Sequence, residues 1–454
     1  MSTTCIERRV RRCVAAALAI VLAACGGGST TETSLTGPGV GNGGSTGGVS
    51  VSAPTGPNTT QIVVDSGPSG GFSLGAANIL YVSVQVCSPG SASRCVTIDH
   101  VALDTGSVGL RLLKSTVASL GLPPVTVPAN PAAGTPAGPA LECYQFVLGG
   151  LWGPLASADL HIAEETAASI PVQLIDDSTA PAYPAPTECV TASNNMLMAS
   201  ASSLQANGIL GVGMLPYDCG LECSNGSYAS GYTLYYACPT AASCGLAAVP
   251  STLQVANPVT KFAVDNNGTI IVMPAVPDLG ATSATGRLVF GIGTQSNNQI
   301  PSTVRVLHVD GNPASLNYLS ITTTVGSTVY PGSYIDSGSN AIFFDDATIA
   351  TKCQSSSGTA GSGWYCPPAI LRRTATLSDT QGTSATVDFS IANADGLFSS
   401  PSVAFSDLGG TTGQAAGTFA WGLPFFYGRS VFTSIWGQWL SPFGNNNIGP
   451  WFAF

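Results

Sequence analysis

Two short strings of the same type carry the clearest chemistry in this chain: Asp104-Thr105-Gly106-Ser107 and Asp336-Ser337-Gly338-Ser339. Each string lies between two apolar runs, which predicts a buried strand that ends in a tight turn. Each turn presents one carboxylate, and two carboxylates brought together can share a single proton. One of them then acts as a base and the other as an acid. The duplicated string is therefore our basis for expecting hydrolysis of a peptide bond.

A third string, Asp65-Ser66-Gly67, has a similar composition but a different context. It lies a short way before Asp104, and Pro68-Ser69-Gly70-Gly71 follows it where the other two strings have an apolar run. Pro, Ser and Gly in succession are typical of turns. We therefore interpret Asp65 as a turn residue, with a role at a domain edge as the lesser alternative.

The elements that must position these turns are predicted to be strands. From about residue 75 onward, short apolar runs alternate with Gly, Pro, Asn and Asp, and sustained helical periodicity is absent from the sequence. The string Asp265-Asn266-Asn267-Gly268, between two apolar runs, predicts a β-hairpin. Residues 214–248, rich in Cys, Tyr, Gly and Ser, are expected to form a surface insertion pinned by disulfides. We therefore expect an all-β fold with short helices and with strands near 79–86, 95–103, 170–175, 268–273, 287–290 and 303–308.

Composition excludes several classes of function. The chain has 454 residues, a net charge of -10 and only 8% charged residues, so the cationic surface that nucleic acid requires is missing. Its length favours two domains. No phosphate-binding loop or dinucleotide fingerprint stands out, so we expect no cofactor. We also expect no metal site, because the three histidines (His100, His161 and His308) are typical of ordinary strand or loop positions.

The first 60 residues have the features of an export signal and a tether. Residues 1–24 combine a basic start with an apolar stretch too short to span a bilayer. The string Leu22-Ala23-Ala24-Cys25-Gly26 resembles a bacterial lipobox, in which the Cys is lipidated and becomes the first mature residue. We expect an exported bacterial lipoprotein, held at the outer membrane through Cys25 with residues 25–60 as a flexible tether. The alternative is an ordinary signal peptide with an incidental Cys.

Ten cysteines follow the lipobox, and an even number in an exported protein favours disulfides over zinc. Local bridges are expected for Cys87–Cys95 and Cys353–Cys366, and a longer one for Cys143–Cys189. Two further bridges are expected among the four remaining cysteines, with their pairing left open: Cys219, Cys223, Cys238 and Cys244.

From about residue 75 to its end the chain resembles the pepsin-like aspartic proteases. In that family each of two β-rich lobes supplies one Asp-Thr/Ser-Gly turn and a later apolar-apolar-Gly strand that threads beneath it. Ile209-Leu210-Gly211 and Ala420-Trp421-Gly422 are similar to these strands. Further similar segments are residues 81–84, 98–103, 286–291 and the terminal 445–449. The resemblance implies a bilobal fold, with an N-terminal lobe at 61–255 and a C-terminal lobe at 256–454.

The resemblance also implies roles for the residues around the two carboxylates. Asp104 and Asp336 would hold one water between them and hydrolyse a peptide or an unfolded protein, and the enzyme would act as a monomer. Gly106 and Gly338 would let the two loops approach closely. Thr105 and Ser337 would lock the loops across the junction, and Ser107 and Ser339 would hydrogen-bond the carboxylates. Hydroxyl donors favour the ionised form, which predicts an acidic activity optimum.

The chain departs from the family at the flap that covers the cleft. The family's flap Tyr has two candidates here, Tyr144 and Phe146, and Arg111 stands where the family carries a Trp. These departures leave a second hypothesis open, in which the protein keeps the fold but binds peptides or proteins without cleaving them. A third hypothesis is a structural surface lipoprotein with unrelated sandwich domains, whose Asp strings are simple turns.

Overall fold

The computed structural model describes residues 48–51, 54–68, 77–130, 134–147, 149–226, 233–349, 353, 363–413, 416–438 and 448–454. The expected signal at 1–24, Cys25, most of the tether and residues 445–447 of the expected terminal hairpin lie outside these ranges. Within them the chain is mostly β-strand with short helices, as the sequence predicts. None of the described helices combines the length and the apolar character needed to cross a membrane.

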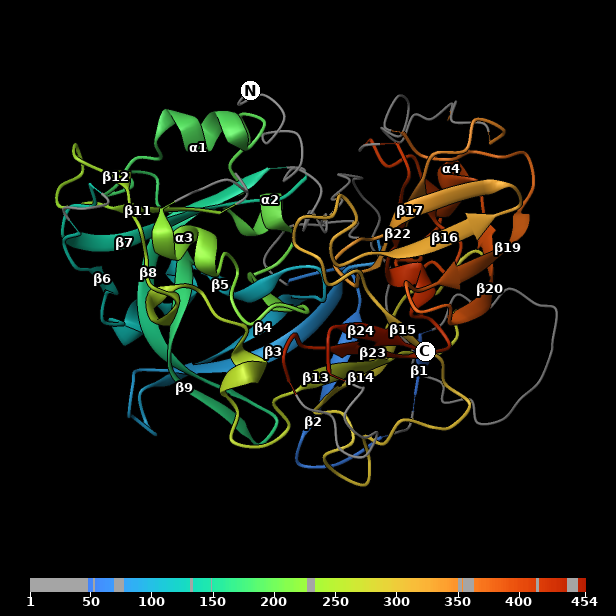
Figure 1. The fold of residues 1–454 in the computed structure, drawn as a ribbon, viewed down its shortest axis with the longest axis horizontal. Helices are drawn as coiled ribbons and strands as arrows, with labels where there is room; N and C mark the ends of the chain where they lie inside the picture. The colour runs from blue at the N-terminus through green and yellow to red at the C-terminus, as the bar shows by residue number, and fades with distance from the viewer. Residues whose placement is uncertain are drawn as a thin grey trace.

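The described strands form two sheets (Figure 1). The larger sheet contains β1 (Val49–Ser50), β2 (Thr59–Val64), β3 (Leu80–Cys87), β4 (Cys95–Asp104), β5 (Val108–Leu113), β6 (Thr126–Val127), β7 (Gly138–Gln145), β8 (Gly150–Ile162), β9 (Glu165–Ile175), β10 (Gly208–Val212), β11 (Thr233–Ala237), β12 (Gly245–Leu246), β13 (Gly268–Val272), β14 (Ala284–Phe290), β15 (Val306–His308), β23 (Ser430–Ser434) and β24 (Trp451–Ala453).

The smaller sheet has the order β20-β19-β16-β17-β22-β18-β21. Its strands are β16 (Ile321–Val325), β17 (Thr328–Ile335), β18 (Ile342–Phe344), β19 (Leu371–Ser378), β20 (Ser384–Ile391), β21 (Gly409–Gly410) and β22 (Thr418–Trp421). The short α-helices are α1 (Thr187–Ala192), α2 (Ala201–Leu204), α3 (Leu221–Asn225) and α4 (Ala394–Phe398). The 3-10 helices are η2 (Lys114–Leu120), η4 (Ser251–Leu253), η5 (Pro258–Lys261) and η6 (Leu423–Phe425).

Strands from both halves of the chain meet in the larger sheet. β2 pairs with β3 on one side and with β14 on the other, so that Ile62 lies opposite both Val82 and Gly286. β13 continues the sheet by pairing with β14 and β23. In Figure 1 these strands lie between the region of β6–β12 on the left and the smaller sheet on the right. The pairing of β2 with β14 therefore joins the part of the chain before residue 255 to the part after it. We call β2, β13, β14 and β23 the connecting platform, and the sequence did not predict it.

The predicted hairpin at residues 265–268 is wrong. The apolar residues before it form no strand, because Asn257 caps η5 and Pro258 starts that helix. Asp265 is buried rather than exposed in a turn, and it accepts hydrogen bonds from Thr294 and Gln295. The side-chain amide of Asn267 donates to the carbonyl of Ile292 through Nδ2 and accepts from the backbone N–H of Ile292 through Oδ1. The string is a buried polar network that anchors the start of β13.

The described cysteines form five disulfides: Cys87–Cys95, Cys143–Cys189, Cys219–Cys223, Cys238–Cys244 and Cys353–Cys366. The three predicted pairs are confirmed, and the other four cysteines pair with their sequence neighbours. The segment 214–248 is pinned by two of these bridges, but it is more than the surface insertion that we expected. Its strand β11 pairs with β7, and the side chains of Tyr235 and Tyr236 have no exposed surface.

Candidate active site

Asp104 is the last residue of β4, and two other strands fix its position. β4 runs parallel to β10, with Asp104 opposite Gly211, and β10 in turn pairs antiparallel with β5. All the residues of β5 and β10 are buried, and all except Arg111 are apolar residues or glycine. The sequence therefore delivers the carboxylate of Asp104 at the end of a buried strand.

Asp336 has the same surroundings in the smaller sheet. It follows β17 directly, β17 runs parallel to β22, and β22 pairs antiparallel with β18. The backbone N–H of Asp336 donates to the carbonyl of Trp421 at 3.0 Å. Both predicted apolar-apolar-Gly strands therefore lie beside the strand that carries their aspartate.

Glycine is required where each later strand passes its loop. A Cβ on Gly211 would lie 2.5 Å from the backbone nitrogen of Val108, and one on Gly422 would lie 2.2 Å from the carbonyl oxygen of Ala341. The backbone N–H groups of Gly213 and Leu423 then donate to the carbonyls of Ser107 and Ser339, at 2.8 and 2.7 Å. The two loops are thus held by the same arrangement, built twice from different parts of the chain.

The two loops meet tip to tip through reciprocal hydrogen bonds. The backbone N–H of Thr105 donates to Ser337 Oγ at 3.1 Å, and the backbone N–H of Ser337 donates to Thr105 Oγ1 at 2.9 Å. Ser337 Oγ donates onward to the carbonyl of Leu103 at 2.8 Å. A Cβ on Gly338 would lie 2.5 Å from Asp104 Oδ1, so the second loop lies directly against the first carboxylate.

The carboxyl groups of Asp104 and Asp336 have no exposed surface and are held by short local bonds. Oδ1 of Asp104 accepts from the backbone N–H of Gly106 at 2.7 Å and of Ser107 at 3.2 Å. Oδ1 of Asp336 accepts from the backbone N–H of Gly338 at 2.8 Å, and its Oδ2 accepts from Ser339 Oγ at 2.6 Å.

The predicted hydroxyl bond is therefore present at Ser339 and absent at Ser107. The hydroxyl of Ser107 lies near Asp104 outside hydrogen-bonding geometry, and no described residue donates a hydrogen bond to Oδ2 of Asp104. The backbone N–H of Ser107 takes the donor role instead. The two aspartates thus differ in their partners, since only Asp336 is bonded by a hydroxyl.

Burial raises the pKa of both carboxyls. For Asp104, the donors around it and the contact with Asp336 oppose this effect but do not cancel it. For Asp336, the negative charge of Asp104 adds to burial and raises the pKa further, well above its ordinary value. The loss of water on burial therefore outweighs the donors in the direction of both pKa shifts. Two interacting buried carboxyls of this kind retain one proton between them.

The flap candidates Tyr144 and Phe146 pack against each other. Tyr144 is in β7, and Phe146 follows in the turn to β8, where its backbone N–H donates to Gly149 at 2.7 Å. Both side chains are buried, and their rings meet edge to face at 5.0 Å. Burial raises the pKa of Tyr144, and the negative charge of Asp104 contributes. The two flap candidates therefore form one buried aromatic pair.

A buried ionic cluster that the sequence did not predict contacts the ring of Tyr144. The guanidinium carbon of Arg111 lies 3.7 Å from the centre of the Tyr144 ring. Nη2 of Arg111 donates to Glu142 Oε1 and Asp218 Oδ2, both at 2.8 Å, and all three side chains lack exposed surface. Tyr235 donates to Asp218 at 2.9 Å. The only signal in the sequence was Arg111 at the position of the family's Trp.

The third Asp-Ser-Gly string forms a local turn. Asp65 accepts from the backbone N–H of Gly67 at 2.9 Å, which confirms the turn, and it also contacts His100 at 3.3 Å.

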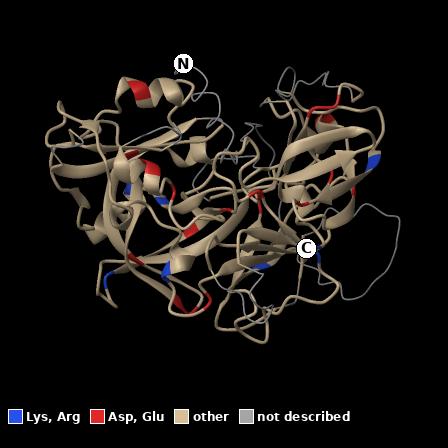
Figure 2. Ribbon diagram, viewed as in Figure 1, with Lys and Arg blue, Asp and Glu red and all other residues tan. Residues whose placement is uncertain are grey.

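Cys353, Cys366 and Asp395 are the one metal-like cluster in the described part of the chain. A disulfide between its two cysteines removes their metal-binding thiolates. In the described part of the chain, Figure 2 shows Lys and Arg scattered over the ribbon rather than gathered on one element.

The buried pair of aspartates, each on its own loop beside a parallel strand, defines a protein with a candidate acid–base centre. The sequence model of one family, described as a protein of unknown function (DUF3443), matches residues 54–454, and the chain belongs to that family. A search of curated proteins found no match to the chain.

Proposed function

We propose that this protein is an aspartic endopeptidase of the pepsin-like type, with Asp104 and Asp336 as its catalytic pair. The observation that carries the proposal is the contact between the two loops. Reciprocal hydrogen bonds between Thr105 and Ser337 hold two buried, interacting carboxyls together. A turn formed for structural reasons alone would gain nothing from a second buried carboxylate beside it, because an unpaired buried charge is costly.

The repeated strand arrangement supports a bilobal pepsin-like fold. Asp104 ends a strand of the larger sheet and Asp336 follows a strand of the smaller one, and each is followed in sequence by its own parallel strand, β10 or β22. In our proposal each sheet region forms the body of one lobe, and β2, β13, β14 and β23 connect the lobes. The predicted lobes at 61–255 and 256–454 are then consecutive in sequence, and the strands that connect them come from both ranges.

The carboxyls would work as one acid and one base on a water molecule. Asp336, whose pKa is raised by burial and by Asp104, keeps the shared proton. Asp104, which accepts two backbone N–H bonds, is the ionised base. Asp104 takes a proton from the water as the water oxygen bonds to the peptide carbonyl carbon. Asp336 hydrogen-bonds the carbonyl oxygen, and a proton passes to the leaving nitrogen as the C–N bond breaks.

The substrate class that we propose is a peptide or an unfolded protein, cleaved by a monomer without a cofactor. We further propose that the enzyme is an exported bacterial lipoprotein tethered to the outer membrane through Cys25, on its periplasmic or surface face. The five disulfides support an oxidising compartment. Labelling with a radioactive fatty acid should mark the wild-type protein and leave Cys25→Ala unlabelled, whereas equal labelling would contradict the anchor.

The activity is tested by cleavage of a reduced and alkylated protein from pH 3 to pH 8. Wild type should cleave it fastest below pH 7, and Asp104→Asn and Asp336→Asn should abolish cleavage. Asp65→Asn is the matched control, because Asp65 belongs to the third Asp-Ser-Gly string and hydrogen-bonds within its own turn. Cleavage that survives either catalytic substitution would contradict the proposal, as would an optimum above neutrality.

A peptide that replaces the scissile carbonyl with a hydroxyl separates cleavage from binding. An active enzyme should bind it and be inhibited by it. Saturable binding of this peptide by a chain that cleaves nothing would favour the second hypothesis, a binding module that retains the fold. The complete burial of both carboxyls and the packing of Tyr144 over Arg111 are the observations that favour this alternative.

A further inference from the structure

Asn78 is a buried residue that bonds the N-terminal half of the chain to the loop of Asp336. It lies just before β3, and β3 pairs antiparallel with β4, the strand that ends in Asp104. The side chain of Asn78 bonds to Asn340, which is 262 residues further along the chain. Asn340 directly follows Ser339, and Ser339 Oγ donates to Asp336 Oδ2. One side chain therefore connects the strand pair that carries Asp104 to the loop that carries Asp336.

The side-chain amide of Asn78 uses all of its hydrogen-bonding capacity. Its Nδ2 donates to the carbonyl of Asn340 at 2.9 Å and to the carbonyl of Phe405 at 2.8 Å. Its Oδ1 accepts from the backbone N–H of Phe405 at 2.7 Å and from the hydroxyl of Tyr427 at 2.8 Å. An amide has two donor hydrogens and two acceptor lone pairs, so these four bonds fix its orientation. Asn78 is only 1% exposed, so bulk water cannot replace a bond that is lost.

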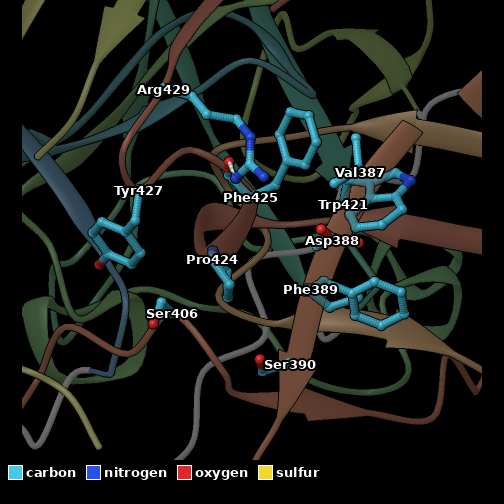
Figure 3. A pocket seen from close by; sticks show the side chains of 11 residues that line it. Val387, Asp388, Phe389, Ser390, Ser406, Trp421, Pro424, Phe425, Tyr427 and Arg429 are labelled. Carbon is cyan, nitrogen blue, oxygen red and sulfur yellow. Dashed lines mark hydrogen bonds between the residues drawn. The ribbon is translucent and has the colours of Figure 1, made fainter. Parts of the chain in front are cut away.

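Backbone and neighbouring contacts hold Asn78 in this position. Its φ of 55° lies in the left-handed region, which Asn adopts more readily than most other residues. Its backbone N–H donates to the carbonyl of Val403 at 2.7 Å. The ring of Tyr427 lines a small pocket in the smaller sheet, and Figure 3 shows its hydroxyl pointing away from Trp421 on the other side of that pocket. Burial raises the pKa of Tyr427 well above its ordinary value, so the hydroxyl keeps its proton and remains a donor to Asn78.

The loop of Asp336 is held from the N-terminal half of the chain at both of its ends. At its start, Ser337 exchanges hydrogen bonds with the other aspartate loop. At its end, the carbonyl of Asn340 accepts from Asn78, and Nδ2 of Asn340 donates to the carbonyl of Ala77 at 3.3 Å. A loop held at only one of these points could pivot about it.

We propose that Asn78 is a positioning residue that holds the Asp336 carboxyl at its working distance from Asp104. The inference rests on the proposed function, because it concerns the same pair of carboxyls. Among the described residues, Asp104 carries the charge that raises the pKa of Asp336. A loop released from Asn78 would let the two carboxyls move apart and let water reach Asp336, and both changes lower the pKa of Asp336. The shared proton would then be lost at a lower pH.

Asn78→Gly tests the proposal, because Gly adopts the same φ and removes all four side-chain bonds. The kcat for cleavage of the unfolded protein, per active site counted with the hydroxyl-containing peptide, should fall at least about tenfold, since a misplacement of about 1 Å can cost about a hundredfold. KM should stay within about twofold of wild type, because a buried residue does not contact the substrate. The alkaline limb of the pH profile should move to lower pH by at least about half a pH unit.

Asn58→Gly is the matched control for a purely structural loss. Asn58 is also fully buried, and its Nδ2 donates at 2.7 Å to the carbonyl of Phe290, which is 232 residues further along the chain. Phe290 belongs to β14 of the connecting platform rather than to either aspartate loop. Both glycine variants should be less stable than wild type in urea, but only Asn78→Gly should change kcat and the pH profile.

A milder variant and a second measurement decide the result if Asn78→Gly fails to fold or if wild type cleaves nothing. Tyr427→Phe keeps the ring and removes one bond to Asn78, so its kcat should fall at least about twofold. Carbon-13 NMR of the aspartate carboxyls measures the pKa of Asp336 without a substrate, and Asp336→Asn assigns the signal. Both Asn78→Gly and Tyr427→Phe should lower this pKa.

The outcomes separate this inference from the proposed function. If wild type cleaves nothing and the pKa of Asp336 still falls in these variants, the proposed function fails and the positioning role is supported. The positioning role is overturned if the folded variants of Asn78 and Tyr427 keep the wild-type pKa at Asp336. It is also overturned if Asn58→Gly lowers kcat as much as Asn78→Gly.

Discussion

Replacing Arg111 with Met isolates the contribution of the buried cluster behind Tyr144. Met has a similar reach and no charge, so the change removes the cation while filling much of its space. Glu142 and Asp218 would then face each other without exposure to water, although both contact Arg111 at 2.8 Å in the native protein. Burial already raises the pKa of Asp218, the charge of Glu142 raises it further, and Arg111 opposes both effects.

The expected loss is large at neutral pH. Removing one partner of a buried ion pair costs about 3–5 kcal/mol, and the lost contact with the Tyr144 ring adds about 0.5–2 kcal/mol. Total stabilities are about 5–15 kcal/mol, so the variant would be close to unfolding. A carboxyl whose folded pKa is raised contributes stability below its unfolded pKa, and this contribution is lost as pH rises. The deficit should therefore be smallest near pH 3.5 and complete at pH 7.

Urea unfolding followed by circular dichroism at pH 3.5 and pH 7 measures this deficit against wild type. The triple variant Arg111→Met, Glu142→Gln, Asp218→Asn should recover most of the free energy of unfolding at pH 7, because no charge is left unpaired. A single variant within about 1 kcal/mol of wild type at pH 7 would refute the reasoning. So would a triple variant that is no more stable than the single one.

Three further predictions concern the loops and the disulfides. Gly422→Ala places a Cβ 2.2 Å from the carbonyl of Ala341 and should lower the free energy of unfolding by at least about 2 kcal/mol in urea, whereas Gly396→Ala, which has open space in α4, should raise it by about 0.5–1 kcal/mol. Equal effects would contradict the close packing of β22 beneath the loop. Asp336→Asn should be more stable than wild type at pH 7, because the raised folded pKa of Asp336 penalises its ionised form, and this gain should vanish below about pH 4. A gain independent of pH, measured by thermal unfolding, would show that the pKa of Asp336 is not raised. Removing Cys143–Cys189 with a double Ala substitution should cost about 4 kcal/mol, given its separation of 46 residues, and an unchanged urea midpoint would count against this bridge.

The parts of the structure that the sequence predicted are those fixed by local patterns. An apolar run before Asp104 and an apolar-Gly strand after it identify a buried strand and its neighbour, since only Gly fits where Gly211 passes the loop. The disulfides were also predictable from local sequence. Four of the five bridges join cysteines 4 to 13 residues apart, so spacing alone limits the choices.

The parts that the sequence could not predict depend on contacts between distant residues. Arg111 contacts Glu142 and Asp218, which are 31 and 107 residues away, and no local pattern pairs them. The error at Asp265 has a similar origin, because a polar string that is typical of a turn is buried by partners near residue 295. The role of β11 as a neighbour of β7 was hidden because a Cys-rich segment resembles a surface loop.

The initial rate of cleavage of an unfolded protein by wild type and by Asp336→Asn, at the acidic optimum, tests the central claim most directly. A shared proton on Asp104 and Asp336 predicts that the variant is slower by at least about a thousandfold, within the range expected for general acid–base catalysis. Asp65→Asn should keep the wild-type rate in the same assay. A rate for Asp336→Asn within a few fold of wild type would contradict the account.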